Sequence, residues 1–132
     1  MKLMVTIPQK LFFKYVDSIE VYEEVKNKKG EIDKKRILLD AVDYLLFDYL
    51  FYIYFSNWVS TIRKDDGVYA WLPYVVIIQD NPQLRINSEN TIAKRIKKLE
   101  KFGLLKTYTT GKKSSRLYFK IDPYIHEYFN MG

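Results

Sequence analysis

The sequence predicts one α+β domain, mainly α, and three observations lead to this prediction. The chain has 132 residues, 48% of them hydrophobic, which is enough to bury one core without metal or disulfide support. Apolar residues recur at three- and four-residue spacing in 37–59 and 89–102, as in helices that face a core. Residues 115–121 alternate between polar and apolar side chains, which is typical of a half-buried strand.

The composition excludes several kinds of chemistry. Cysteine is absent and His126 is the only histidine, so disulfides, thiolate metal sites and a histidine-rich zinc site are excluded. The adjacent carboxylate pairs Glu23-Glu24 and Asp65-Asp66 are not spaced to share one helical face, and no glycine loop suited to phosphate is present. We therefore expect no enzyme activity, no cofactor, no metal and no small-molecule ligand.

The N-terminal residues and the most apolar segment both argue for an intracellular protein. Residues 1–6 lack the apolar core and cleavage site of a signal peptide. The run 44–55 contains Asp48 and is too short to span a bilayer core of about 30 Å. We expect a cytoplasmic protein with no membrane association.

Positive charge is concentrated in one part of the chain. Residues 82–120 contain eleven Lys or Arg and two acids, a net charge of +9, whereas the whole chain carries +6. The remaining residues therefore sum to −3. A basic segment within a slightly acidic chain indicates a surface that binds a polyanion, although charge alone would also fit a soluble lysine-rich surface.

The segment 37–59 predicts one long helix with two apolar stripes. The first is expected to face the core and consists of Leu38, Val42, Leu45, Leu46, Tyr49 and Ile53. The second is aromatic, shares its face with Asp40 and Asp43, and consists of Tyr44, Phe47, Phe51 and Phe55. Either the terminal segments fold over this second stripe or it forms the interface of a homodimer, because exposed aromatic stripes are rarely left bare.

A second helix is predicted from Glu89 to Phe102. Ser88 suits its N-cap, and Gly103 supplies the left-handed residue that ends it. The buried stripe consists of Ile92, Ile96 and Leu99. The opposite side is cationic or amide-bearing and contains Asn90, Lys94, Lys97, Lys98 and Lys101, with Thr91 and Arg95 on its flank.

Two strands follow this helix, at 105–109 and 115–121. The glycine-containing segment 110–114 between them carries Lys112 and Lys113, and therefore predicts a hairpin with a basic tip. A short helix is predicted from Pro73 to Asp80, before the helix at 89–102, because proline suits the first helical position. Helix, helix and basic hairpin make up the layout of a winged helix-turn-helix, here with a long N-terminal core helix and a C-terminal β-hairpin wing.

Within a single domain covering 1–132 we expect four parts. These are an N-terminal arm or extension (1–36), the long helix and a polar loop (37–67), the winged helix-turn-helix core (68–121) and a short C-terminal helix (122–132) that packs His126 on the body. The loop is expected at 60–67, with Asp66-Gly67 as its turn. For 18–36 two possibilities stay open, a hairpin of half-buried strands turning at 27–30 or a continued helix.

The region from Trp71 to Ile121 resembles the winged helix-turn-helix superfamily. The signature shared with bacterial winged-helix regulators and replication proteins is carried by Ser88, Thr91, Ile92, Ile96, Leu99, Glu100, Gly103, Leu104 and Leu105. The Ile7-Pro8-x-x-Leu11-Phe12 segment before the long helix is similar to plasmid and phage replication initiators and to the N-terminal domain of DnaD-like primosomal proteins. The turn at 82–87 is longer than in simple repressors, which agrees better with the replication-type group.

The resemblance implies sequence-specific binding of double-stranded DNA, in transcription regulation or in replication initiation of a phage or plasmid, by a homodimer. The helix at about 89–102 would enter the major groove, and the wing at about 110–116 would contact the backbone or minor groove. Asn90 would read adenine and Lys94 guanine. The remaining DNA contacts implied are Ser88, Thr91, Arg95, Lys98, Lys112, Lys113 and Arg116. The alternative is a protein-interaction adaptor that uses the aromatic helix face on the same scaffold.

Overall fold

The computed structural model describes residues 6–56, 59–108 and 115–130, and it confirms an α+β protein with more helix than strand. The helices are α1 (Gln9–Asp17), α2 (Ala41–Ser56), α3 (Tyr74–Asp80), α4 (Glu89–Lys101) and α5 (Pro123–Asn130), with a 3-10 turn η1 (Pro82–Leu84). The strands are β1 (Val21–Lys26), β2 (Ile32–Ile37), β3 (Ser60–Lys64), β4 (Gly67–Pro73), β5 (Lys106–Thr107) and β6 (Arg116–Lys120).

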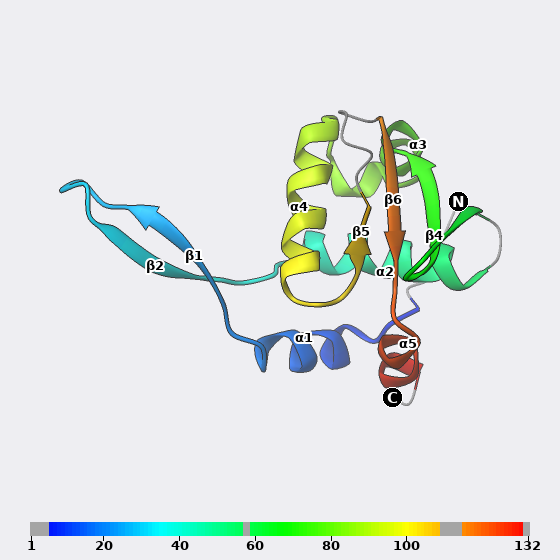
Figure 1. Ribbon diagram of the computed structural model, residues 1–132, viewed down its shortest axis with the longest axis horizontal. Helices are drawn as coiled ribbons and strands as arrows, with labels where there is room; N and C mark the ends of the chain where they lie inside the picture. The colour runs from blue at the N-terminus through cyan, green and yellow to red at the C-terminus, as the bar shows by residue number, and fades with distance from the viewer. Residues whose placement is uncertain (1–5, 57–58, 109–114, 131–132) are drawn as a thin grey trace.

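Helix α2 lies at the centre of the molecule. Figure 1 shows α3, α4 and the larger sheet on one side of α2, and α1 and α5 on the other. Both sides of α2 are consequently buried, and its buried residues include Leu46, Leu50 and Phe51. No described helix is long and apolar enough to cross a membrane.

The terminal helices cover the aromatic stripe of α2. Phe12 of α1 contacts Tyr44 and Phe47, with ring centroids 5.1 and 5.8 Å apart. The rings of Phe51 and Phe55 lie 5.5 and 4.2 Å from that of His126 in α5. The second interpretation, in which Tyr44, Phe47, Phe51 and Phe55 form a dimer interface, is therefore wrong, because the first three are at most 3% exposed within the single chain.

A reciprocal cap sets the start of α2 at Ala41 rather than at Ile37. The backbone N–H of Asp43 donates to Oδ1 of Asp40 (2.9 Å), and the N–H of Asp40 donates to Oδ2 of Asp43 (3.0 Å). Both are side-chain caps of otherwise unpaired N–H groups at a helix start. Leu38 thus lies before the helix and is 61% exposed, so its predicted place in the core is wrong.

The larger sheet has the antiparallel strand order β3-β4-β6-β5. Its inner face is formed by Ala70 and Leu72 of β4 and by Leu117 and Phe119 of β6, which are all buried. The predicted alternation at 115–121 is confirmed. The predicted loop at 60–67 is wrong, because Ser60–Lys64 pairs with β4 as an exposed edge strand and only Asp65 and Asp66 form the turn.

Helices α3 and α4 are close to their predicted positions. A segment of eight residues, 81–88, joins them and contains η1 and Arg85, whose φ of 55° is left-handed. The phenol of Tyr49 in α2 donates to Asp80 at the end of α3 (2.7 Å), and burial raises the pKa of this phenol. The amide of Asn81 donates to the carbonyl of Ile77 (2.7 Å) and closes α3.

Residues 21–37 form a hairpin, which decides between the two possibilities left open by the sequence. Asn27 organises the turn, since its side-chain oxygen accepts from the N–H groups of Lys29 (2.9 Å) and Glu31 (3.0 Å). The expected half-burial of the strands is wrong beyond the hairpin base, because Ile37 is the one buried strand residue and Ile32 is 64% exposed.

The buried Asp48 holds the segment that precedes α1, and its removal should destabilise the fold. Oδ1 of Asp48 accepts from the N–H groups of Thr6 (2.8 Å) and Ile7 (2.7 Å). Asp48→Ala would leave these donors unpaired, and we expect the free energy of unfolding to fall by about 1–3 kcal/mol in urea denaturation. Asp17→Ala, at an exposed acid, should change it by less than about 0.5 kcal/mol. Equal stability of the two variants would contradict this role of Asp48.

Candidate nucleic-acid interface

The side of α4 that faces away from the core carries mainly amide, hydroxyl and ammonium groups. Ile92, Ile96 and Leu99 are buried on the inner side, as the sequence predicts. Glu89, the acid among the exposed residues of α4, lies in the first turn, where a carboxylate stabilises the helix N-terminus. The other exposed residues define the exposed face of α4 and are Asn90, Thr91, Lys94, Lys97 and Lys101.

Arg95 and Lys98 do not belong to this exposed face, because they bind the N-terminus of α2. Nη1 of Arg95 lies 2.9 Å from Oδ1 of Asp40 and 2.8 Å from Oδ1 of Asp43. Nζ of Lys98 lies 2.8 Å from Oδ2 of Asp43. The carboxylate of Asp43 is fully buried, so these two cations compensate its charge. Arg95 and Lys98 therefore fix α4 against α2 instead of pointing outward.

The same contacts shift the ionisation of the groups involved. Burial opposes the charged form of Asp40, but hydrogen bonds from the Asp43 backbone and from Arg95 outweigh it, and the pKa of Asp40 is lowered from 3.8. Burial likewise opposes the charged form of Arg95, and its hydrogen bonds to Asp43 and Asp40 raise its pKa nonetheless. Both groups are charged at neutral pH.

The opposite flank of α4 is tied to the sheet. Glu100 accepts from the backbone N–H of Thr107 in β5 (3.0 Å) and from its hydroxyl (2.8 Å). Gly103 ends the helix with a φ of 74°, as predicted, which lets the chain turn into β5. With one flank bound to α2 and the other to β5, α4 has a fixed rotation about its axis.

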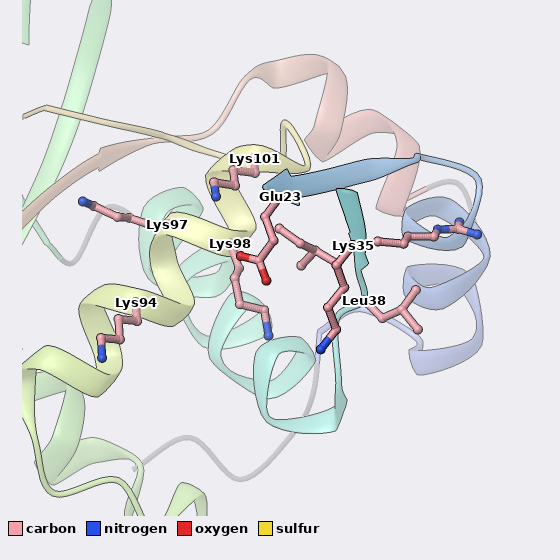
Figure 2. A pocket seen from close by; sticks show the side chains of 9 residues that line it. Glu23, Lys35, Leu38, Lys94, Lys97, Lys98 and Lys101 are labelled. Carbon is pink, nitrogen blue, oxygen red and sulfur yellow. The ribbon is translucent and has the colours of Figure 1, made fainter. Parts of the chain in front are cut away.

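A basic groove lies between α4 and the β1–β2 hairpin. It has a volume of about 480 Å³ and is lined by Glu23, Arg36, Ile37 and Leu38 and by the lysines Lys35, Lys94, Lys97, Lys98 and Lys101. Figure 2 shows Glu23, Lys35 and Lys98 pointing into the same space, whereas Lys97 points away from the hairpin. The hairpin thus forms a second wall beside one flank of α4.

The remaining predicted contacts are dispersed. Ser88 is the N-cap residue of α4, although its side chain makes no capping hydrogen bond. Arg116 begins β6, and its guanidinium lies 4.6 Å from the ring centroid of Trp71 on the outer face of the sheet. Lys112 and Lys113, with most of the predicted wing at 110–116, lie outside the described residues.

Sequence reasoning missed the hairpin wall and the anchoring role of two cations. Glu23 and Lys35 had no predicted role, because the structure of residues 18–36 was left open. Asp40 and Asp43 have the three-residue spacing of a reciprocal helix cap, a signal that points to acids bound to the start of a helix at this position. Within the described part of the chain, no group of three or more His, Cys, Asp or Glu residues is placed to hold a metal ion.

Comparison of the chain with protein-family models, with curated proteins and with solved structures found no match.

Removing the carboxylate of Asp43 should loosen α4 from α2. Asp43→Ala deletes the bonds to Arg95 and Lys98 and one half of the α2 cap. We expect the free energy of unfolding in urea to fall by about 2–3 kcal/mol, since charged hydrogen bonds are lost but the two cations can reach water. Asp65→Ala, in the exposed β3–β4 turn, is the control and should have little effect. A similar small loss for both variants would contradict the anchoring role of Asp43.

Low pH should reduce the contribution of Asp40 to the stability of the fold. Because its folded pKa is lowered from 3.8, ionised Asp40 stabilises the fold above that value, and this contribution is lost as the pH falls through the lower folded pKa. Near neutral pH, we expect the free energy of unfolding of the wild type to exceed that of Asp40→Asn by less than about 1 kcal/mol, since Asp40 is more than half exposed. The difference should shrink as the pH falls below about 4. Urea denaturation across this range measures it, and a constant difference would contradict the assignment.

Proposed function

We propose that the chain binds duplex DNA through the exposed face of α4, in the manner of a winged helix-turn-helix. The order of elements supports this proposal, since α3, a turn, α4 and the strands β5 and β6 follow one another as in that fold. The chain segments before and after this unit, α2 and α5, pack against it or against each other as one body. Most of the wing, at 110–116, lies outside the described residues, and its contact with DNA is part of this proposal.

The observation that carries the proposal is the division of charge around α4. Its two flank cations, Arg95 and Lys98, are paired with Asp40 and Asp43. The lysines of its exposed face have no such acidic partners among the described residues. A rigid helix whose outward side carries an amide, a hydroxyl and three lysines matches the phosphates and base edges of a major groove.

Individual roles follow from chemistry and position on the helix. Asn90, in the N-terminal half of α4, would pair with adenine N6 and N7, and Lys94 one turn further would reach guanine O6 or N7. Thr91, Lys97 and Lys101 would contact phosphates. Arg95 and Lys98, which the resemblance alone would assign to phosphates, serve in this proposal to hold α4 in place. Ser88, Arg116, Lys112 and Lys113 remain proposed backbone contacts.

Transcription regulation and replication initiation of a phage or plasmid are both compatible with such a protein in the cytoplasm. A homodimer, which would read two half-sites, has to use a surface other than the aromatic stripe of α2. The adaptor alternative relies on that same stripe, which is buried under α1 and α5. No observation therefore favours the adaptor over DNA binding.

Removing lysines from the exposed face of α4 should weaken binding to duplex DNA. Fluorescence anisotropy with a random-sequence duplex, titrated at several salt concentrations, measures Kd and its salt dependence. For Lys94→Ala combined with Lys97→Ala, we expect a higher Kd at every salt concentration and a log–log slope lowered by about 1, for the phosphate contact of Lys97.

The matched control is Lys10→Ala combined with Lys14→Ala, which removes the same charge from exposed positions of α1. Equal effects of the two double variants would show a merely global charge effect and contradict the proposal. Absence of duplex binding by the wild type at low salt would overturn it outright. A clear preference for single-stranded DNA would overturn the assignment to duplex.

A further inference from the structure

The β1–β2 hairpin projects from the body (Figure 1), and within the described part of the chain its two strands pair with no strand but each other. Ten of its twelve strand residues are exposed, which is unusual for a two-stranded sheet, because an isolated hairpin has little stability of its own. The hairpin is nevertheless well formed. Its turn is held by Asn27, and its base by buried Ile37 and by a hydrogen bond from Arg36 to the carbonyl of Asp17 (3.1 Å).

The register of the hairpin sorts its charges onto two faces. Glu23 lies directly opposite Lys35, and Glu24 directly opposite Lys34. Since successive side chains of a strand point to opposite faces, these are two equivalent pairs on opposite sides of the hairpin. The Glu23–Lys35 pair faces the groove beside α4, as Figure 2 shows, and Glu24–Lys34 therefore faces away from it.

The groove between the two walls is strongly positive. Its lining contains six cations (Lys35, Arg36, Lys94, Lys97, Lys98 and Lys101) and one acid (Glu23), and Asp43 beneath α4 compensates Lys98, which leaves a net charge of +4. With a volume of about 480 Å³ it is too small for a whole duplex. A single sugar-phosphate strand has the opposite charge.

The dimensions of B-DNA place such a strand here. An α-helix with its side chains is about 10–12 Å across and fills a major groove about 12 Å wide. The two sugar-phosphate backbones that border the groove must then run along the two flanks of the helix. On one flank of α4, the hairpin forms the wall beyond the groove, and its Lys35 points into that space.

We infer that the β1–β2 hairpin is a second DNA-binding element, in which Lys35 grips the phosphate backbone that passes between the hairpin and α4. This inference rests on the proposed binding of duplex DNA by α4. In the complex the hairpin gains the contact surface that it lacks in the chain alone. Glu23 opposes the phosphates from within the same groove and keeps the affinity of this contact moderate.

The two faces of the hairpin supply matched variants. Lys35→Glu and Lys34→Glu make the same charge change on neighbouring residues of one strand, and each disrupts one cross-strand pair. In anisotropy titrations with a random-sequence duplex, Lys35→Glu should raise Kd about threefold or more and lower the log–log salt slope by about 1. Lys34→Glu should change both much less.

A second pair of variants separates DNA contact from hairpin stability. Glu23→Gln and Lys35→Glu both remove the Glu23–Lys35 attraction, so a purely structural effect would change affinity in the same direction. We expect opposite directions, with tighter duplex binding for Glu23→Gln and weaker binding for Lys35→Glu. Glu24→Gln, on the outer face, should stay close to wild type.

The outcomes distinguish this inference from the proposed function. If Lys94→Ala with Lys97→Ala weakens duplex binding but Lys35→Glu and Lys34→Glu are alike, the hairpin inference is overturned and the role of α4 stands. The same holds if Glu23→Gln weakens binding. If the wild type binds no duplex at low salt, both fail together.

Discussion

The buried carboxylate of Asp43 is the constraint on which the rest of the structure depends. Taking a carboxylate out of water is costly unless charge and hydrogen bonds replace its hydration. Asp43 obtains both from three sources, the N–H of Asp40, the guanidinium of Arg95 and the ammonium of Lys98. Because these donors come from the start of α2 and the middle of α4, one carboxylate sets where α2 begins and how α4 lies against it. The rotation of α4, and with it the identity of the exposed lysines, follows from this contact together with the buried stripe of Ile92, Ile96 and Leu99.

This arrangement divides the cations of α4 between two tasks. Arg95 and Lys98 contribute to the fold, and their charge is largely compensated within the chain. Lys94, Lys97 and Lys101 add nothing to the core and repel one another, so their concentration on one side is a cost for the isolated protein. A polyanionic partner removes this cost, whereas a neutral partner does not. The net charge of the chain does not distinguish the paired cations from the exposed lysines, because each adds one positive charge.

The parts of the fold that sequence predicts well are those whose signals are local. Helix α4 has a clear apolar stripe, a capping residue and a terminal glycine, and its bounds differ from the prediction by a single residue. Helix α2 is apolar around its whole circumference, so its sequence pattern does not show which side faces the core. Only the packing of α1 and α5 decides it. The strand β3 was predicted as a loop, because the sequence of an exposed, polar edge strand resembles that of a loop. For the candidate site, the exposed lysines were visible in the helical pattern, but the pairing of Arg95 with residues more than fifty positions earlier was not.

The hairpin shows why the remaining part of the site required the structure. Each face of the hairpin carries one acid–base pair, Glu23 opposite Lys35 on one and Glu24 opposite Lys34 on the other, so these charges do not distinguish the two faces. Orientation comes instead from its base, where Ile37 is buried and the next residues lead directly into the cap of α2 at Asp40. The acid pair that anchors α4 is thus joined to the hairpin by a connection of three residues, 38–40. This short link keeps the groove face of the hairpin beside α4 and makes its two walls parts of one unit. A substitution at the base would therefore disturb both walls, whereas one at Lys35 changes the chemistry of a single wall.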